Sequence, residues 1–411
     1  NDYQGLAFAI YKVAYDFSQT KNPFAGSILS AVNSLIFDDK VSGFKNQAAL
    51  KKLQIAKLTR KDPLTCVLAE FVTTLQSESK LTSDEKLEII SSSISKAADE
   101  MLLFLIQKIS ESLRDGDLAG LLKSVSGALP GVFISIPFFT SLNVMHQSRW
   151  LLDALSEEYI HPVDRKKKKV LWFTDTFLEL SGVSATLQEL AKLTLDRKLD
   201  MKIVTCLPSP DQRTTGIPEN VIDLPSIHSI TPDFFNTYTL RIPSVMAALK
   251  IISDEEPDEV YISTPGAVGL LGILVAKLFH IPSTAVYHTD FTRQFRQIIG
   301  DETMCQITED YVNWFHSLAD TVAVPTQEYA TQLERRGISK AKLRKFRRGI
   351  DPSVFAPGTS SEYLSRMYGI TDGTTLLHSG RVSKEKNLDF LASVYTDIVK
   401  EYPETNLLIV G

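Results

Sequence analysis

The chain has 411 residues, of which 44% are hydrophobic and 23% are charged, and its formal net charge is −5 at pH 7. This length predicts two or three domains, because a single hydrophobic core stops growing at about 250–300 residues. The composition excludes an intrinsically disordered chain, and the weakly acidic charge argues against a general nucleic-acid binder. The sequence also lacks an apolar run of the roughly 18 residues that predict a membrane-spanning helix.

The cysteines predict neither a disulfide framework nor a zinc site. Cys66, Cys206 and Cys305 are odd in number, lie far apart and include no Cys-x-x-Cys pair. Such cysteine usage is typical of a reducing compartment. We therefore expect a cytoplasmic protein, and no motif in the sequence implies a metal ion.

Residues 1–160 predict an all-α region. Apolar residues recur at helical spacing in several segments, including residues 141–159. The segment 81–113 opens with Thr82 and Glu85 at the spacing of a capping box. No motif in this region indicates a function.

The basic run Arg165–Lys169 follows the helical region and marks an expected domain boundary. A cluster of cations can contact an anionic lipid surface, so peripheral membrane contact is one hypothesis for this run. The alternative is a linker whose charges face solvent.

From Val170 the sequence alternates short apolar strands with amphipathic helices, which is the pattern of a doubly wound parallel sheet. We expect one Rossmann-like domain over residues 168–355 and the start of a second over residues 356–411. A hinge is expected near Pro352–Pro357. Because the first residue is Asn and the last follows the strand-like run NLLIV, we expect a sequence that is cut at both ends.

Gly182 is the first candidate for a ligand site, because it stands between a strand and a helix. The free N–H groups and the positive end of a helix N-terminus can bind phosphate or another anion. The alternative is a turn that needs glycine only for its backbone conformation.

A second candidate follows the strand TTLLHS. Gly380 stands at the expected turn, Arg381 is next to it, and Lys386 comes just before a helix. A guanidinium fork, an ammonium and a helix N-terminus together suit a nucleotide diphosphate. The alternative is a polar surface loop.

A third glycine-rich segment, residues 263–279, predicts a structural role. Gly269 and Gly272 fall inside an expected helix after a strand. Glycines at such positions let a helix lie close to the sheet. We therefore expect packing here rather than ligand binding.

Five ordered segments together resemble the retaining glycosyltransferases of family 4, which have the GT-B fold of two Rossmann-like domains. The segments are SGVSATLQEL, YISTPGAVGLLGILVAKLFHIPSTAVYHTDF, VPTQEYATQLERRG, RRGIDPSVFAP and SGRVSKEKNLDFL. The resemblance covers residues 168–411, with the acceptor-side domain first and the donor-binding domain second. The order of YHTDF and RRGID is most similar to the branch that glycosylates lipids.

The resemblance implies transfer of a hexose from a nucleoside-diphosphate sugar to an acceptor, a lipid or a glycan, with retention of configuration. It implies that Gly182 lies in the loop that faces the donor diphosphate, and that Gly380, Arg381 and Lys386 bind this diphosphate. His288 is implied at the cleft beside the donor sugar, where its imidazole hydrogen-bonds the sugar. The nucleotide sugar is then a substrate, and neither a cofactor nor a metal is implied.

The resemblance leaves two roles for Asp290, which either caps a turn or contacts the acceptor. The family also has a glutamate pair, E-x7-E, which binds the donor, and the sequence ends before it, so we expect the chain to be inactive as it stands. The alternatives are a nucleotide-sugar epimerase or phosphorylase on the same scaffold, or a non-catalytic interaction protein.

Overall fold

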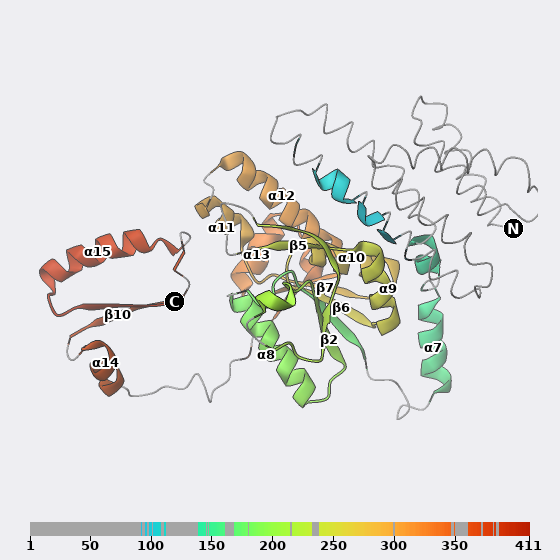
Figure 1. Ribbon diagram of the computed structural model, residues 1–411, viewed down its shortest axis with the longest axis horizontal. Helices are drawn as coiled ribbons and strands as arrows, with labels where there is room; N and C mark the ends of the chain where they lie inside the picture. The colour runs from blue at the N-terminus through green and yellow to red at the C-terminus, as the bar shows by residue number, and fades with distance from the viewer. Residues whose placement is uncertain are drawn as a thin grey trace, which may run out of the picture.

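The computed structural model describes most of the chain from residue 168 onward and shorter stretches before it (Figure 1). The described residues are 92, 95–96, 98–100, 102–107, 111, 139–144, 146, 148–160, 168–179, 181–213, 216–231, 238–298, 301–346, 349, 361–370, 373–380, 382–383 and 386–411. The expected capping box, the expected hinge, Cys66 and Arg381 lie outside these residues.

A seven-stranded sheet forms the centre of the first α/β unit, and all its neighbouring strands run parallel. The strand order is β3-β2-β1-β6-β7-β8-β9. The expected doubly wound parallel sheet is therefore confirmed. The strands are β1 (Val170–Phe173), β2 (Met201–Thr205), β3 (Val221–Asp223), β6 (Glu259–Ile262), β7 (Ser283–Val286), β8 (Thr321–Val324) and β9 (Leu343–Lys345).

Helices cover both faces of this sheet (Figure 1). In β1, Leu171 and Phe173 point into one core with α9 and α10, whereas Trp172 points into the opposite core with α8. This alternation follows from the two-residue period of a strand, and it explains why a strand buried on both faces is apolar throughout. The helices are α8 (Gly182–Asp196), α9 (Val245–Glu255), α10 (Ala267–Leu278), α11 (Phe291–Ile298), α12 (Glu302–Leu318) and α13 (Gln327–Arg335).

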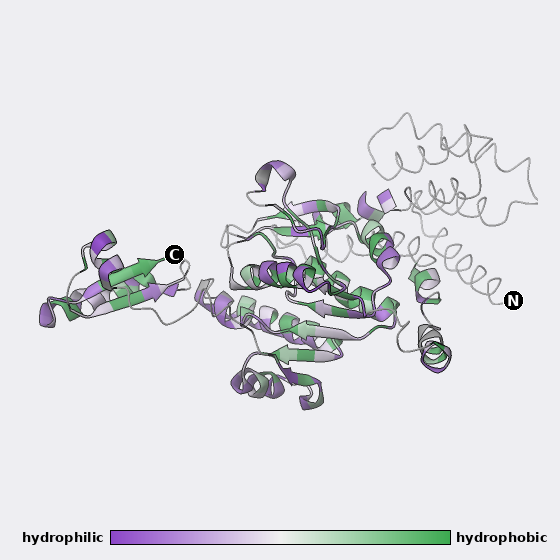
Figure 2. Ribbon diagram, turned by 90° about the horizontal axis from the view of Figure 1, so that it is seen from below, coloured by the Kyte–Doolittle hydropathy of each residue, from purple (hydrophilic) through white to green (hydrophobic). Residues whose placement is uncertain are grey.

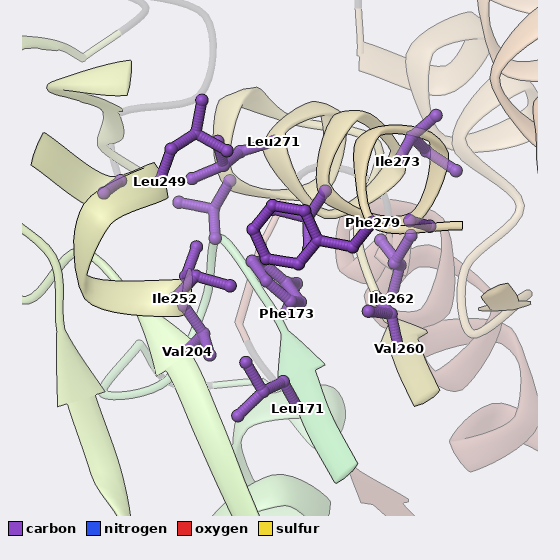
Figure 3. Close-up of a cluster of buried hydrophobic side chains, with 14 of the residues drawn as sticks. Leu171, Phe173, Val204, Leu249, Ile252, Val260, Ile262, Leu271, Ile273 and Phe279 are labelled. Atoms are coloured by element: carbon purple, nitrogen blue, oxygen red, sulfur yellow. The ribbon is translucent and has the colours of Figure 1, made fainter. Parts of the chain in front are cut away.

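The larger core lies between the sheet and the helices α9 and α10. Figure 3 shows Phe173 and Ile262 from neighbouring strands beneath Leu249, Leu271 and Phe279. The hydropathy colouring of Figure 2 shows the same division, with hydrophobic residues concentrated on the strands and on the helix faces toward them.

Two glycines let α10 lie close to the sheet. A side chain at Gly269 would overlap the carbonyl oxygen of Thr264, and a Cβ at Gly272 would lie 2.9 Å from Cγ of Phe173. The packing role predicted for both glycines is confirmed.

Smaller elements complete the first unit. An antiparallel hairpin joins β4 (Ser226–Ile230) to β5 (Leu240–Pro243), and β5 packs against α10. Two short 3-10 helices are η1 (Pro210–Gln212) and η3 (Lys340–Lys342).

The C-terminal unit has its own two-stranded parallel sheet, in which β10 (Thr375–Ser379) pairs with β11 (Asn406–Val410). Its helices are α14 (Ser361–Tyr368) and α15 (Leu388–Glu401). The connection through α15 is the expected βαβ unit.

The described part of the region before residue 160 is helical, and part of it packs on the first unit. Phe139 and Leu142 join the core beneath α10, and the His146 ring stacks on Phe279 with 4.1 Å between centroids. The single helix expected over residues 141–159 is interrupted at Ser148, which is the N-cap of α7 (Arg149–Tyr159). Among the described residues, no helix combines the length and apolar character needed to cross a lipid bilayer.

Candidate active site

The carboxyl edge of the sheet between β1 and β6 is the place where the fold favours a ligand. From β1 the chain proceeds outward to β2 and β3, and it later returns to place β6 on the other side of β1. Open α/β sheets bind ligands in the crevice at such a reversal of strand order. The residues that follow β1, β6 and β7 therefore form the candidate site.

Asp175, two residues after β1, is buried at this edge of the sheet. Its buried carboxylate accepts hydrogen bonds from the Thr264 hydroxyl at 2.6 Å and from the Val268 N–H at 2.8 Å. It also accepts the N–H groups of Gly266 and Gly269, at 3.1 and 3.2 Å. Asp175 thus satisfies the free donors at the N-terminus of α10.

Burial raises the pKa of the Asp175 carboxyl, and the hydrogen bonds from Thr264 and from the backbone oppose this rise. Asp175 was not predicted as a site residue from the sequence. The one feature that could have indicated it is an acidic residue shortly after an apolar strand. Its partners lie about 90 residues further along the chain.

Gly182 is the first residue of α8, as expected, and Ser181 is the N-cap, whose hydroxyl oxygen accepts the Ser184 N–H at 3.1 Å. Gly182 is exposed, and a Cβ placed on it would meet no atom within 4 Å. It is also absent from the glycines with positive φ. Neither backbone conformation nor close packing therefore requires a glycine here, and the N-terminus of α8 is open to an approaching group.

The loop before α8 is held by three contacts. The Phe177 N–H donates to Oε2 of Glu179 at 2.8 Å, and Phe177 accepts at its carbonyl from Nε2 of Gln188 at 2.6 Å. Oε1 of Glu179 pairs with Nη1 of Arg241 in β5 at 3.0 Å. The loop that leads to Gly182 is thereby tied to both α8 and the β4–β5 hairpin.

His288 lies two residues beyond β7, at the same edge of the sheet. Its Nε2 lies 3.0 Å from Oγ of Ser263, which follows β6, and Ser263 accepts the indole N–H of Trp172 at 2.7 Å. The Phe346 ring meets the imidazole edge-on, with 6.2 Å between centroids. The imidazole is therefore held by Ser263, which follows β6, and by Phe346, which follows β9.

Asp290 caps α11. Its Oδ1 accepts the Arg293 N–H at 3.2 Å, and Oδ2 lies 3.5 Å from Nε2 of Gln332. Arg336 approaches Oδ1 at 4.0 Å and pairs more closely with Glu309, at 3.1 Å. The structure thus supplies a capping role for Asp290, one of the two roles considered for it.

Gly380 and Lys386 lie in the turn between β10 and α15. Gly380 has φ of +151°, a conformation that favours glycine, and donates its N–H to the Val410 carbonyl at 2.9 Å. Lys386 is exposed directly before α15, whose N-cap is Asn387. Gly380 and Lys386 are thus the described residues of this predicted diphosphate loop, and Arg381 lies outside the described residues.

The remaining polar clusters do not add a second site. Within the described ranges, no group of three or more His, Cys, Asp or Glu side chains could hold a metal ion. Cys206 and Cys305 are buried and free, and burial raises the pKa of the Cys206 thiol to about 12. Cys206 is therefore an unreactive thiol.

Comparison with known proteins identifies the family of this part of the chain. Residues 180–354, which include Gly182, Ser263 and His288, match the family model described as Glycosyltransferase Family 4. These residues form a glycosyltransferase family 4 domain. The resemblance stated from the sequence motifs is therefore confirmed for the part of the chain that carries the candidate site.

Relatives of the family 4 domain include a mannosyltransferase and a glucosyldiacylglycerol synthase. The chain is 27% identical over 180 residues to a GDP-mannose-dependent alpha-mannosyltransferase of Mycobacterium tuberculosis, covering 43% of this chain and 46% of that protein. It is 27% identical over 257 residues to the alpha-monoglucosyldiacylglycerol synthase of Streptococcus pneumoniae, covering 58% of this chain and 54% of that protein. The chain thus spans about half the length of these curated relatives.

A solved structure with some similarity to the chain is Anabaena Alr3699/HepE in complex with UDP and glucose. The two share 15% sequence identity, with a TM-score of 0.43 over 59% of this chain and 60% of that one.

Proposed function

We propose that the protein is a glycosyltransferase that moves a hexose from a nucleoside-diphosphate sugar to a lipid or glycan acceptor with retention of configuration. The observation that carries this proposal is the family 4 match over residues 180–354, the segment that contains Gly182 and His288. The names of the relatives, which act with GDP-mannose or make a glucosyl-diacylglycerol, favour a nucleotide sugar as donor.

In this proposal the N-terminus of α8 faces the donor diphosphate. The free N–H groups of a helix N-terminus attract an anion, and exposed Gly182 leaves space for one to approach. His288 hydrogen-bonds the sugar beside it. Groups that are already fixed in place stabilise charge as it develops, and the contacts of His288 with Ser263 and Phe346 fix the ring.

The C-terminal unit contributes the second part of the donor site. Gly380 and Lys386 lie in the turn before α15, and Arg381 is next to Gly380 in the sequence, so two cations would bind the diphosphate as it leaves. We propose that the reaction needs no metal ion, because the sequence has no acidic DxD motif at a strand end. Activity that survives excess EDTA is the expected result, and activity restored only by a divalent cation would contradict this part.

We propose further that the protein contacts a membrane surface from its cytoplasmic side. Two members of the basic run are engaged with the protein, because Lys168 pairs with Glu259 at 2.5 Å and the Lys169 ammonium donates to the Glu255 carbonyl at 3.0 Å. The contact would therefore rest on Arg165, Lys166 and Lys167.

Vesicle sedimentation tests the membrane contact. Changing residues 165–167 to Gln should weaken binding to anionic vesicles, since each cation near such a surface contributes about 1 kcal/mol. Lys168→Gln is the control, and its effect per cation removed should be smaller. Binding that does not depend on anionic lipid would contradict the electrostatic contact.

The transferase activity is tested with the full-length protein, radiolabelled GDP-mannose or UDP-glucose, and diacylglycerol or glycan acceptors. We expect labelled product with an α-linkage from an α-linked donor, and loss of product in His288→Ala. A nucleotide sugar that is only epimerised, or no binding of either donor, would contradict the proposal.

A further inference from the structure

Three side chains from different strands form a hydrogen-bonded chain on one face of the sheet. Trp172 lies in β1, Ser263 follows β6, and His288 follows β7. The register pairs Trp172 with Tyr261, and Tyr261 with Thr284. Since side chains alternate along a strand, Ser263 and His288 share the face of Trp172.

The available hydrogens decide the direction of this chain. An indole N–H can only donate, so Trp172 donates to Oγ of Ser263 at 2.7 Å. A serine hydroxyl carries one hydrogen, and within the described part of the chain the other partner of this oxygen is Nε2 of His288, at 3.0 Å. The hydroxyl therefore donates to Nε2, and the single proton of the neutral imidazole is on Nδ1.

The reverse direction is unfavourable. If Nε2 carried the proton and donated to Ser263, the serine oxygen would accept twice and its own hydrogen would have no acceptor among the described residues. Ser263 is only 4% exposed, so water cannot readily replace that acceptor. Leaving a buried donor unpaired is costly, whereas the first arrangement pairs both hydrogens.

Packing fixes the three groups in this arrangement. Trp172 is 6% exposed and stacks on Tyr261, with 4.8 Å between ring centroids. Phe346 packs against both Trp172 and His288, at 6.4 and 6.2 Å between centroids. Packing thus holds both the indole N–H and the imidazole against Oγ of Ser263.

We propose that Trp172 and Ser263 are positioning residues that hold His288 as the Nδ1–H tautomer. The imidazole then carries its proton on Nδ1, so this atom can act as a hydrogen-bond donor and not as a general base. This role rests on the proposed function, in which His288 hydrogen-bonds the donor sugar, and it specifies which ring nitrogen carries the proton. It agrees with the contribution expected from a fixed donor rather than from proton transfer.

Nitrogen NMR of the full-length protein labelled with ¹⁵N-histidine tests the tautomer without any substrate. At about pH 8, above the ordinary histidine pKa of 6.5, Nε2 of His288 should show a pyridine-like shift and Nδ1 a pyrrole-like shift. The Nδ1–H form should be in about tenfold excess, as one good hydrogen bond allows. Ser263→Ala should reduce this excess at least threefold, and Trp172→Phe should change it in the same direction while keeping an aromatic ring.

Two controls separate this effect from a general loss of structure. Ser283→Ala removes another buried serine hydroxyl, which donates to Asp320 at 2.7 Å, and should leave the His288 tautomer unchanged. His316 is an internal reference, because its Nδ1 donates to the Val312 carbonyl at 2.7 Å and its signals should not move in Ser263→Ala.

The proposal is overturned if wild-type His288 is mainly the Nε2–H tautomer. It is also overturned if Ser263→Ala, with His316 signals intact, leaves the tautomer ratio unchanged. Since the NMR measurement requires no catalysis, absence of transferase activity would contradict the proposed function and not the tautomer.

Discussion

Glu179 and Arg241 form an ion pair of 3.0 Å between the loop that precedes α8 and the β4–β5 hairpin. Their side chains are only 15% and 14% exposed. The second carboxylate oxygen of Glu179 also binds the Phe177 N–H. One carboxylate therefore holds the start of α8 to an element 62 residues further along the chain.

Removing one member of this pair should destabilise the protein. In Arg241→Met, Glu179 loses its ion-pair partner in a largely buried position, and loss of one partner of such a pair costs about 3 kcal/mol. The urea unfolding midpoint measures the loss. Lys277→Met, which breaks an ion pair whose members are 52% and 51% exposed, should cost under about 1 kcal/mol. Equal effects of the two substitutions would show that the Glu179–Arg241 pair contributes no more to the free energy of unfolding than an exposed ion pair.

Alanine should have opposite effects on stability at two helical glycines. Gly269→Ala places a methyl group against the Thr264 carbonyl, so overpacking should cost about 1–3 kcal/mol or more. Gly182→Ala meets open space and should leave stability unchanged or raise it by about 0.4–1 kcal/mol. Thermal unfolding of both variants measures the difference.

The same Gly182→Ala variant also tests the anion site at α8. If the donor diphosphate approaches this N-terminus, the added methyl group should raise the KM for the donor several-fold in a stable protein. A donor KM equal to that of the wild type would place the diphosphate elsewhere.

Lowering the pH should reduce the stability of the protein because of His316 in α12. Burial lowers the pKa of this histidine to about 4, and the hydrogen bond to Val312 opposes the shift only in part. Above pH 6.5 the ring is neutral in both the folded and the unfolded state, so it adds no pH dependence. Below pH 6.5 the unfolded state binds the proton more tightly, and the free energy of unfolding should decrease by about 1.4 kcal/mol per pH unit until pH 4.

His316→Leu isolates this contribution. Between pH 6.5 and 5.0, wild-type protein should lose about 2 kcal/mol more than the variant in urea titrations. Parallel pH profiles for the two proteins would mean that folding does not lower the pKa of His316.

Arg381→Ala and Lys386→Ala should lower turnover in the full-length protein without unfolding it. A charge-assisted contact that strengthens as the diphosphate leaves contributes about 2–4 kcal/mol, which corresponds to roughly thirty-fold or more in rate. The double variant should be less than additive, because both cations share one anion. Lys400→Ala in α15, where Lys400 pairs with Asp397 on the surface, is the control. Wild-type turnover and donor affinity in both single variants would rule out this diphosphate loop.

The sequence predicts the local elements of this fold better than its long-range contacts. The starts of α8 and α15 and the packing of Gly269 follow from local patterns, because turns, helix starts and apolar periodicity are encoded within a few residues. His288 could be placed at a strand end for the same reason.

Contacts between distant residues could not be predicted in this way. Asp175 reads as a polar residue after a strand, and only the parallel register of β1 and β6 brings it to the N-terminus of α10. The sequence predicts no partner for the basic run, whereas Lys168 and Lys169 are paired with groups about 90 residues away. A periodic pattern records which face a side chain occupies, and it does not identify the partner on the other element.

The carboxylate of Asp175 makes the two helix N-termini at this edge of the sheet electrostatically unequal. Two helices, α8 and α10, start at the carboxyl ends of adjacent strands, and each presents a positive end to the same edge of the sheet. At α10 this end is already neutralised by a side chain of the protein itself. An incoming anion therefore meets an asymmetric pair, in which α8 attracts it and the neutralised end of α10 does not, so the charged end of a bound molecule is drawn toward α8.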